Sequence, residues 1–160
     1  MWYRASADPV VEDGLRRVYN RLESLIAQEG AVCWASGRCC RFESFGHDLY
    51  VTGLEVAWVL RQVESDSGGA PAGWSRRLIM DGPCPFQATK LCSVRQIRPL
   101  GCRVFFCQEG TERWQQEVYE QMLGDLRSLH DIHDVEYRYL EWRRALSAGL
   151  QWKEASESHD

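Results

Sequence analysis

Residues 84–107 read CPFQATKLCSVRQIRPLGCRVFFC and hold four of the seven cysteines of the chain. Proline cannot continue a helix or fit the interior of a sheet, and this region follows Pro83 directly and holds Pro85 and Pro99. We therefore expect a mostly irregular, cysteine-rich loop over 84–107. The other three cysteines share a second predicted loop over 33–41: Cys33, Cys39 and Cys40.

Apolar stripes predict helices on both sides of these loops. In residues 8–29 the apolar positions recur with alternating spacings of four and three, which aligns them on one helical face. Asp8 followed by Pro9 is typical of a helix start, and Gly30 is typical of a helix end. Similar stripes predict a helix over 111–132 and a final helix that carries Val135, Tyr139, Trp142 and Leu146.

The segment between the two loops predicts one more helix. Thr52-Gly53-Leu54-Glu55 is a capping box, in which the hydroxyl and the carboxylate each bind a backbone N–H. We expect the helix that it opens to run to Glu64. A short strand or hairpin is predicted over 42–51, with Leu49 and Val51 on one face, and a flexible loop over 65–73.

These elements predict a mainly α fold with a short β-hairpin. A chain of 160 residues is the size of one domain. We expect a single metal-binding domain over 1–150, in which helices pack around the irregular cysteine loops 33–41 and 84–107. The polar residues 151–160 are predicted to be a disordered tail.

Composition narrows the function classes. The net charge is −4, and a nucleic-acid-binding domain usually has a strong basic excess. The start Met1-Trp2-Tyr3-Arg4 does not resemble a signal peptide, and no stretch approaches the ~18 apolar residues of a membrane span. We therefore expect a cytoplasmic protein with no nucleic-acid or membrane partner. Its odd number of cysteines would stay reduced there and serve metal binding or catalysis.

Positive charge is concentrated around the cysteines. No acidic residue occurs from Gly82 to Gln108, while Lys90, Arg95, Arg98 and Arg103 are all basic. Arg38 and Arg41 flank the pair Cys39-Cys40 in the same way. Nearby cations lower the pKa of a thiol and offset the charge of a thiolate-bound centre. We predict that Arg98 and Arg103 lie beside such a centre, although Pro99 could shape this loop for structural reasons alone.

The cysteine spacing favours an iron–sulfur cluster over a lone zinc ion. Successive cysteines are separated by 5, 0, 43, 7, 9 and 4 residues, so the C-x2-C pair typical of zinc sites is missing. A cluster accepts ligands from separate loops, including a four-residue spacing. Buried structural cysteines are the alternative. The predicted ligands are drawn from Cys33, Cys39, Cys40, Cys84, Cys92, Cys102 and Cys107.

The order of these motifs resembles the YkgJ-type cysteine-cluster family, described as a zinc- or iron-chelating domain. The resemblance rests on Cys39-Cys40, on Cys84-Pro85-Phe86, and on Arg98-Pro99-Leu100-Gly101-Cys102-Arg103. It implies metal chelation by the cysteines at these positions. The family usually begins C-x2-C-x2-C-C, and Ser36 stands at its second cysteine position here. Ser36 could be a weak ligand, or His47 could take the place of the missing cysteine.

Distantly similar flagellin lysine methylases of the FliB type carry a related cysteine arrangement. This resemblance implies that some relatives couple an iron–sulfur centre to protein modification. No nucleotide-binding, P-loop, serine-hydrolase or metalloprotease motif occurs in the sequence. His130 and His133 have a spacing that can chelate a metal, but solvated histidines at a helix end are the more ordinary interpretation.

Three functions therefore stay open. The first is a module that holds an iron–sulfur cluster, of the 4Fe–4S type, or iron for electron transfer, sensing or support of a partner enzyme. The second is a zinc-stabilised interaction domain without chemistry of its own. The third is an enzyme similar to protein lysine methylases, which rests on the family resemblance alone.

Overall fold

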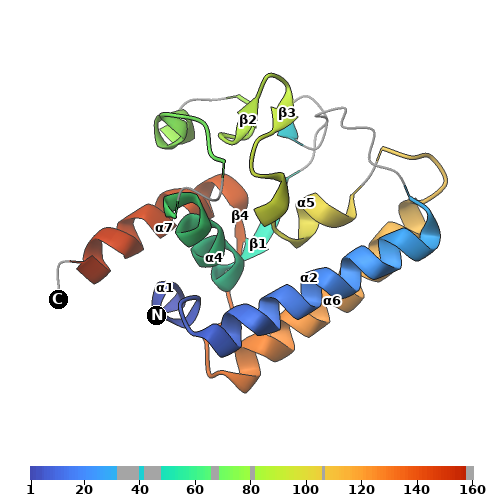
Figure 1. The fold of residues 1–160 in the computed structure, drawn as a ribbon, viewed down its shortest axis with the longest axis horizontal. Coiled ribbons are helices and arrows are strands. Elements are labelled where there is room, and N and C mark those ends of the chain that lie inside the picture. Colours follow the sequence, from blue (N-terminus) through green and yellow to red (C-terminus); the bar gives the residue numbers. More distant parts are fainter. Residues whose placement is uncertain (32–39, 42–47, 66–68, 80–81, 106, 158–160) are drawn as a thin grey trace.

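The computed structural model describes residues 1–31, 40–41, 48–65, 69–79, 82–105 and 107–157 (Figure 1). The elements in chain order are α1 (Trp2–Ala5), α2 (Pro9–Glu29), β1 (Tyr50–Thr52), α4 (Gly53–Glu64), η2 (Trp74–Ile79), β2 (Gln87–Ala88), β3 (Leu91–Cys92), η3 (Arg95–Ile97), α5 (Leu100–Val104), α6 (Glu112–Ile132), β4 (Tyr139–Glu141) and α7 (Trp142–Glu157). The fold is mainly helical with a small hairpin, as predicted. No helix among the described residues is long and apolar enough to cross a membrane.

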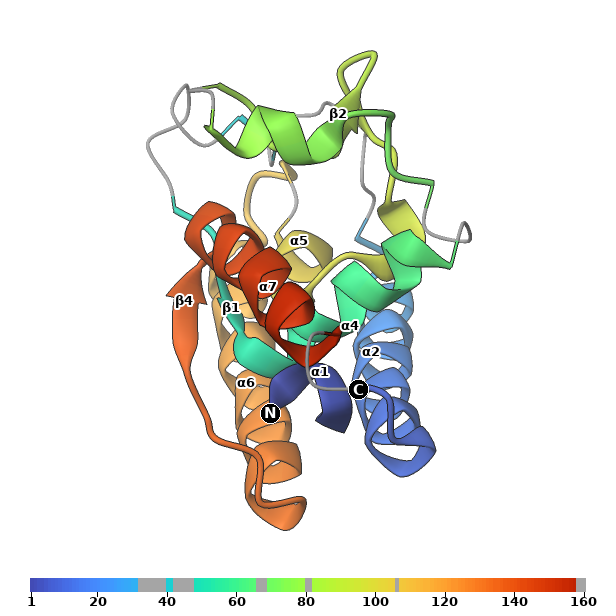
Figure 2. The same ribbon diagram turned by 90° about the vertical axis from the view of Figure 1, so that its left-hand side faces the viewer.

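Two pairs of helices form the body of the molecule. The long helices α2 and α6 lie side by side, and α4 packs against α7 (Figures 1 and 2). The short α5 contacts both α2 and α6. The β2–β3 hairpin and η2 lie together at the top of both views, far from α1 and the N-terminus.

The predicted ends of α2 are confirmed. The Asp8 carboxylate accepts a hydrogen bond from the Val10 N–H at 2.8 Å, and Pro9 occupies the first helical position. Gly30 ends the helix in the left-handed conformation, with φ of 70°, which costs glycine little. The stripe of α2, which includes Leu15 and Leu22, is buried against the matching stripe of α6. Each such leucine contributes roughly 1.5–3 kcal/mol on burial.

The capping box of α4 is confirmed as well. The Thr52 hydroxyl accepts from the Glu55 N–H, and the Glu55 carboxylate accepts from the Thr52 N–H. The helix ends at Glu64, as predicted. Its side chains are buried almost all round in its first two turns, because α1, α7 and the core all contact it.

The strand before α4 pairs with a distant partner. Leu49 and Val51, predicted to share one face, are both buried, but within the described residues β1 does not pair inside 42–51. It pairs antiparallel with β4, so that Val51 faces Leu140. Residues 42–47 of the predicted hairpin lie outside the described residues.

Two predictions at the C-terminus are wrong. The final helix does not include residues 135–141, because β4 uses its backbone groups to pair with β1. Asp134, with φ of 51°, interrupts the helical path after α6. The helix α7 then continues to Glu157, so residues 151–157 are helical and not a disordered tail. The apolar stripe continues past Gly149, where Leu150 and Trp152 pack against the core.

The region 84–107 is more ordered than its prolines indicate. It contains the β2–β3 hairpin, the short turn η3 and the helix α5. Thr89 and Lys90 form the two-residue connection of the hairpin, and both have positive φ, as a type I′ turn requires. Sequence reasoning missed this hairpin because that turn normally carries Asn or Gly.

Candidate metal centre

The two predicted cysteine loops meet at Cys40 and Cys84. The Cys84 N–H donates to the Cys40 carbonyl at 2.7 Å, and both side chains are buried. This contact joins residues that 43 positions separate in the sequence. The structure thus brings one cysteine of each loop to the same place.

The Cys84 sulfur accepts hydrogen bonds from three directions. The Cys40 side chain, the Trp142 indole N–H and the Phe86 backbone N–H all donate to it, and the indole nitrogen lies 3.5 Å from the sulfur. The bond from Cys40 contributes most to lowering the pKa of Cys84 below its usual value; burial opposes it. The three bonds together outweigh the burial. This sulfur is therefore suited to the thiolate form, unlike an inert buried thiol.

Cys92 is the third cysteine near this point. It ends β3 and is half-buried, and its negative charge as a thiolate acts to raise the pKa of Cys84. Ser93 holds the segment that joins Cys84 to Cys92. Its N–H and its hydroxyl both donate to the Phe86 carbonyl, at 3.0 and 2.7 Å. Cys92 thus acts on Cys84 through its charge, whereas Cys40 bonds to Cys84 directly.

Of the remaining predicted ligands, only Cys102 and Cys107 lie within the described residues. Cys102 sits in α5, where its charge acts on Tyr19, and Cys107 follows α5; both are half-buried. Cys33, Ser36, Cys39 and His47 lie outside the described residues. Among the residues that are described, no three His, Cys, Asp or Glu side chains are grouped closely enough to hold a metal ion.

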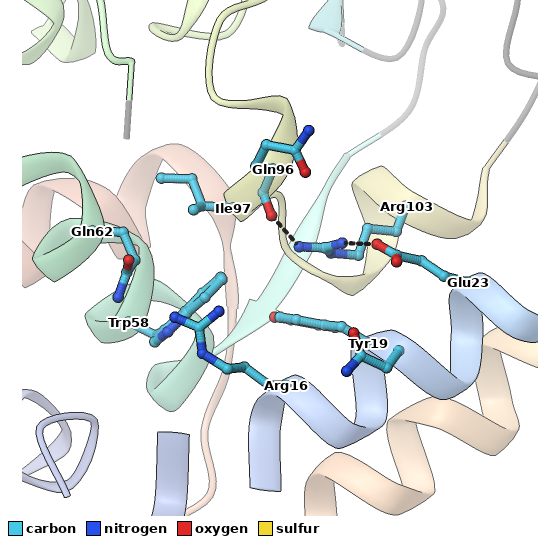
Figure 3. A pocket seen from close by; sticks show the side chains of 9 residues that line it. Arg16, Tyr19, Glu23, Trp58, Gln62, Gln96, Ile97 and Arg103 are labelled. Carbon is cyan, nitrogen blue, oxygen red and sulfur yellow. Dashed lines mark hydrogen bonds and ion pairs between the residues drawn. The ribbon is translucent and has the colours of Figure 1, made fainter. Parts of the chain in front are cut away.

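Arg103 lies beside α2 and is engaged by four neighbouring groups. Its guanidinium donates to the carbonyls of Arg98 and Gln96 at 2.6 and 2.7 Å, and it pairs with Glu23 at 2.9 Å (Figure 3). The guanidinium also stacks 4.2 Å from the centre of the Tyr19 ring. Burial lowers the pKa of Arg103. The predicted Arg98 donates through Nε to the Arg95 carbonyl at 3.1 Å, so both arginines hold the shape of this loop.

Glu55 links the capping box to the cysteine region. Its carboxylate accepts the Leu100 N–H at 2.8 Å and the Tyr19 hydroxyl at 3.1 Å, besides the Thr52 N–H. Burial raises the pKa of Glu55. Leu100 begins α5, which carries Cys102. The motif predicted only the contact with Thr52, since nothing in the sequence indicates which distant groups a buried carboxylate meets.

The first residues of α7 hold the segment that precedes Cys84. The Arg143 guanidinium donates to the carbonyls of Arg77 and Pro83 at 2.6 and 2.8 Å. Its neighbour Trp142, predicted only as a core residue, donates to the Cys84 sulfur. Sequence reasoning missed both roles, because they depend on β4 placing the start of α7 beside this loop.

His130 lies in the last turn of α6. His130 is buried, and its Nδ1 lies 3.1 Å from the carbonyls of Val135 and Glu136. Carbonyls only accept, so Nδ1 carries the proton. Nε2 has no hydrogen-bond partner within the described part of the chain. Burial lowers the pKa of His130, which favours the neutral ring. The contacts of His130 connect α6 to the turn that leads to β4.

Comparisons with protein-family models, curated proteins and solved structures gave no match. The resemblance to the YkgJ-type family therefore stays a prediction. Function has to be inferred from the chemistry of this chain's own residues.

Proposed function

We propose that this chain is a metal-binding module in which cysteine thiolates centred on Cys84 hold an iron–sulfur cluster. The observation that carries the proposal is the environment of the Cys84 sulfur, which is buried but accepts three hydrogen bonds that lower its pKa. Such bonds stabilise thiolate ligands and tune the potential of a cluster.

The donor set suits this chemistry. Cys40, Cys84 and Cys92 would supply soft sulfur ligands, which select iron–sulfur clusters, zinc or copper(I) over hard cations. Further ligands would come from Cys33, Cys39, Cys102 and Cys107. When bound, the cluster would supply one-electron chemistry. The chain's own residues exclude water around Cys84, favour ionisation of its thiol by lowering its pKa, and fix the segment that carries it.

The proposal implies a reducing compartment such as the cytoplasm, since thiols stay reduced there. It also implies a protein partner that exchanges electrons with the module or depends on it. A zinc-stabilised interaction domain would use the same sulfurs and differs in the metal that is bound. A methylase-like activity would require binding of S-adenosylmethionine, which a direct titration tests.

The test compares Cys84→Ser with Trp142→Phe after anaerobic purification. We expect wild-type protein to be brown and to contain iron and sulfide. Cys84→Ser should lose the metal because it removes a ligand. Trp142→Phe keeps an aromatic ring and every predicted ligand but removes the N–H donor together with part of the buried indole, so it should retain the metal with a shifted reduction potential.

Circular dichroism of both variants shows whether they fold. A folded Cys84→Ser protein with full metal content would refute the role of this residue. Colourless wild-type protein with stoichiometric zinc would refute the cluster and support the zinc-stabilised interaction domain.

A further inference from the structure

Positive charge is concentrated in the part of the chain that forms η2, the β2–β3 hairpin and α5. Six basic residues and one acidic residue occur from Gly69 to Gln108, a net charge of +5, whereas the whole chain carries −4. The rest of the chain therefore carries −9. Four of the six basic residues are exposed to solvent: Arg76, Arg77, Lys90 and Arg95.

Contacts between η2 and the hairpin bring three of these charges to one end of the molecule. The Arg77 guanidinium donates to the Gln87 carbonyl of β2 at 2.8 Å, and the centres of the Trp74 and Phe86 rings lie 4.7 Å apart. Figures 1 and 2 show both elements at the same end of the fold. Arg76 and Arg77 of η2 and Lys90 of the hairpin connection are here called the cationic surface.

No carboxylate among the described residues pairs with the cationic surface. Every ion pair within this part of the chain involves other basic side chains, from α2, α4, α5 and the segment before β4. Arg103, for example, is already paired with Glu23. The cationic surface therefore presents its charge to solvent, where it attracts an anionic partner at long range.

An exposed apolar side chain lies beside these charges. Leu91 follows Lys90 directly and is 46% exposed. Apolar contacts with a charged rim are typical of protein–protein interfaces. A nucleic acid offers phosphates to the basic side chains, but the negative charge of the rest of the chain opposes its approach. A protein surface rich in Asp and Glu with an apolar centre matches both the cations and Leu91.

We propose that the cationic surface and Leu91 form the docking site for an acidic protein that exchanges electrons with the metal centre. The electron exchange rests on the proposed function. Leu91 precedes Cys92 in β3, and Phe86 lies two residues after Cys84, so a partner docked on the hairpin is close to the predicted ligands. The negative charge elsewhere on the chain repels an acidic partner and so orients it toward the hairpin.

Fluorescence anisotropy with a dye-labelled peptide of alternating glutamate and leucine tests the docking site. The same peptide with glutamine in place of glutamate is the ligand control, and duplex DNA is titrated in parallel. We expect saturable binding of the acidic peptide that weakens as salt is added, and much weaker binding of the glutamine peptide.

The chain offers a matched pair of variants. Lys90→Glu and Arg4→Glu each reverse one exposed charge and change the net charge equally, but Arg4 lies in α1, at the other end of the molecule (Figures 1 and 2). Lys90→Glu should weaken binding of the acidic peptide by about two- to tenfold. Arg4→Glu should change it by less than about twofold, because salt screens exposed charges beyond about 8 Å. Arg76→Glu is a second variant of the surface and should behave like Lys90→Glu.

Leu91→Ser separates a protein partner from a nucleic acid. It should weaken binding of the acidic peptide and leave any binding of DNA unchanged. DNA that binds more tightly than the acidic peptide would overturn the assignment to a protein.

Equal affinities of Lys90→Glu and Arg4→Glu, with both folded by circular dichroism, would refute the site. An acidic peptide that binds no better than the glutamine peptide would also refute it. The titration does not require bound metal, so failure of the docking site and failure of the metal centre are separate results.

Discussion

Replacing Glu55 by Ala should destabilise the protein strongly. The carboxylate is 1% exposed and accepts from two backbone N–H groups and the Tyr19 hydroxyl. The variant leaves these three donors without an acceptor, at roughly 1–3 kcal/mol each. Removing a buried carboxylate offsets part of this cost. We expect a net loss of about 2–5 kcal/mol in the free energy of unfolding, close to the cost of breaking a buried ion pair.

Urea unfolding followed by circular dichroism measures this loss. With a slope of about 2 kcal/mol per molar urea, the midpoint should fall by about 1–2.5 M. Glu64→Ala is the control, since Glu64 ends the same helix and its hydrogen bond with Tyr3 is exposed. It should cost less than about 1 kcal/mol. Equal losses in the two variants would refute the role assigned to Glu55.

The pH dependence provides a second readout for Glu55. Burial raises the pKa of the folded carboxyl above its ordinary value of 4.5, so the folded chain binds more protons than the unfolded chain just above that pH. The contribution of Glu55 to stability therefore falls as the pH rises through this window. The Glu55→Ala variant should lack this component. A slope that is identical in both proteins would contradict the raised pKa.

Three further outcomes follow from the packing. Arg143→Gln should speed tryptic cleavage of the segment before Cys84, because it removes the donors to four carbonyls there, while the exposed neighbour Arg144→Gln should not. Gly124→Ala should raise the free energy of unfolding by about 0.5–1 kcal/mol, since nothing lies near its Cβ position. Gly14→Ala should lower it, because a Cβ there would lie 2.4 Å from the side chain of Leu129 in the facing helix. Burial lowers the pKa of His130, so on acidification the unfolded chain binds a proton at a higher pH than the folded chain. Stability should therefore fall as the pH drops below about 6.5. His130→Asn keeps an N–H donor and should make the melting temperature less dependent on pH in that range.

Helices with local signals were predictable from the sequence. The caps of α2 and the capping box of α4 lie within a few residues of the helix ends that they define. Their physics is local, so a sequence pattern contains it. The apolar stripe over 111–132 likewise predicted α6, because a single buried face is enough to specify a helix of this length.

Long-range pairings were not predictable. The pairing of β1 with β4 turned a predicted helical stretch into a strand, since backbone bonds to Tyr50–Thr52 outweigh a weak helical pattern. The backbone hydrogen bond between Cys84 and Cys40 likewise joins segments that are distant in the sequence. The hydrogen bond from Trp142 to Cys84 depends on tertiary placement, and no motif marks it.

Iron, zinc and sulfide analysis of the anaerobically purified chain, with its visible spectrum, tests the central claim most directly. We expect brown protein with stoichiometric iron and sulfide, and loss of both in folded Cys84→Ser. Metal-free wild-type protein in which all seven cysteines react as ordinary thiols would contradict it.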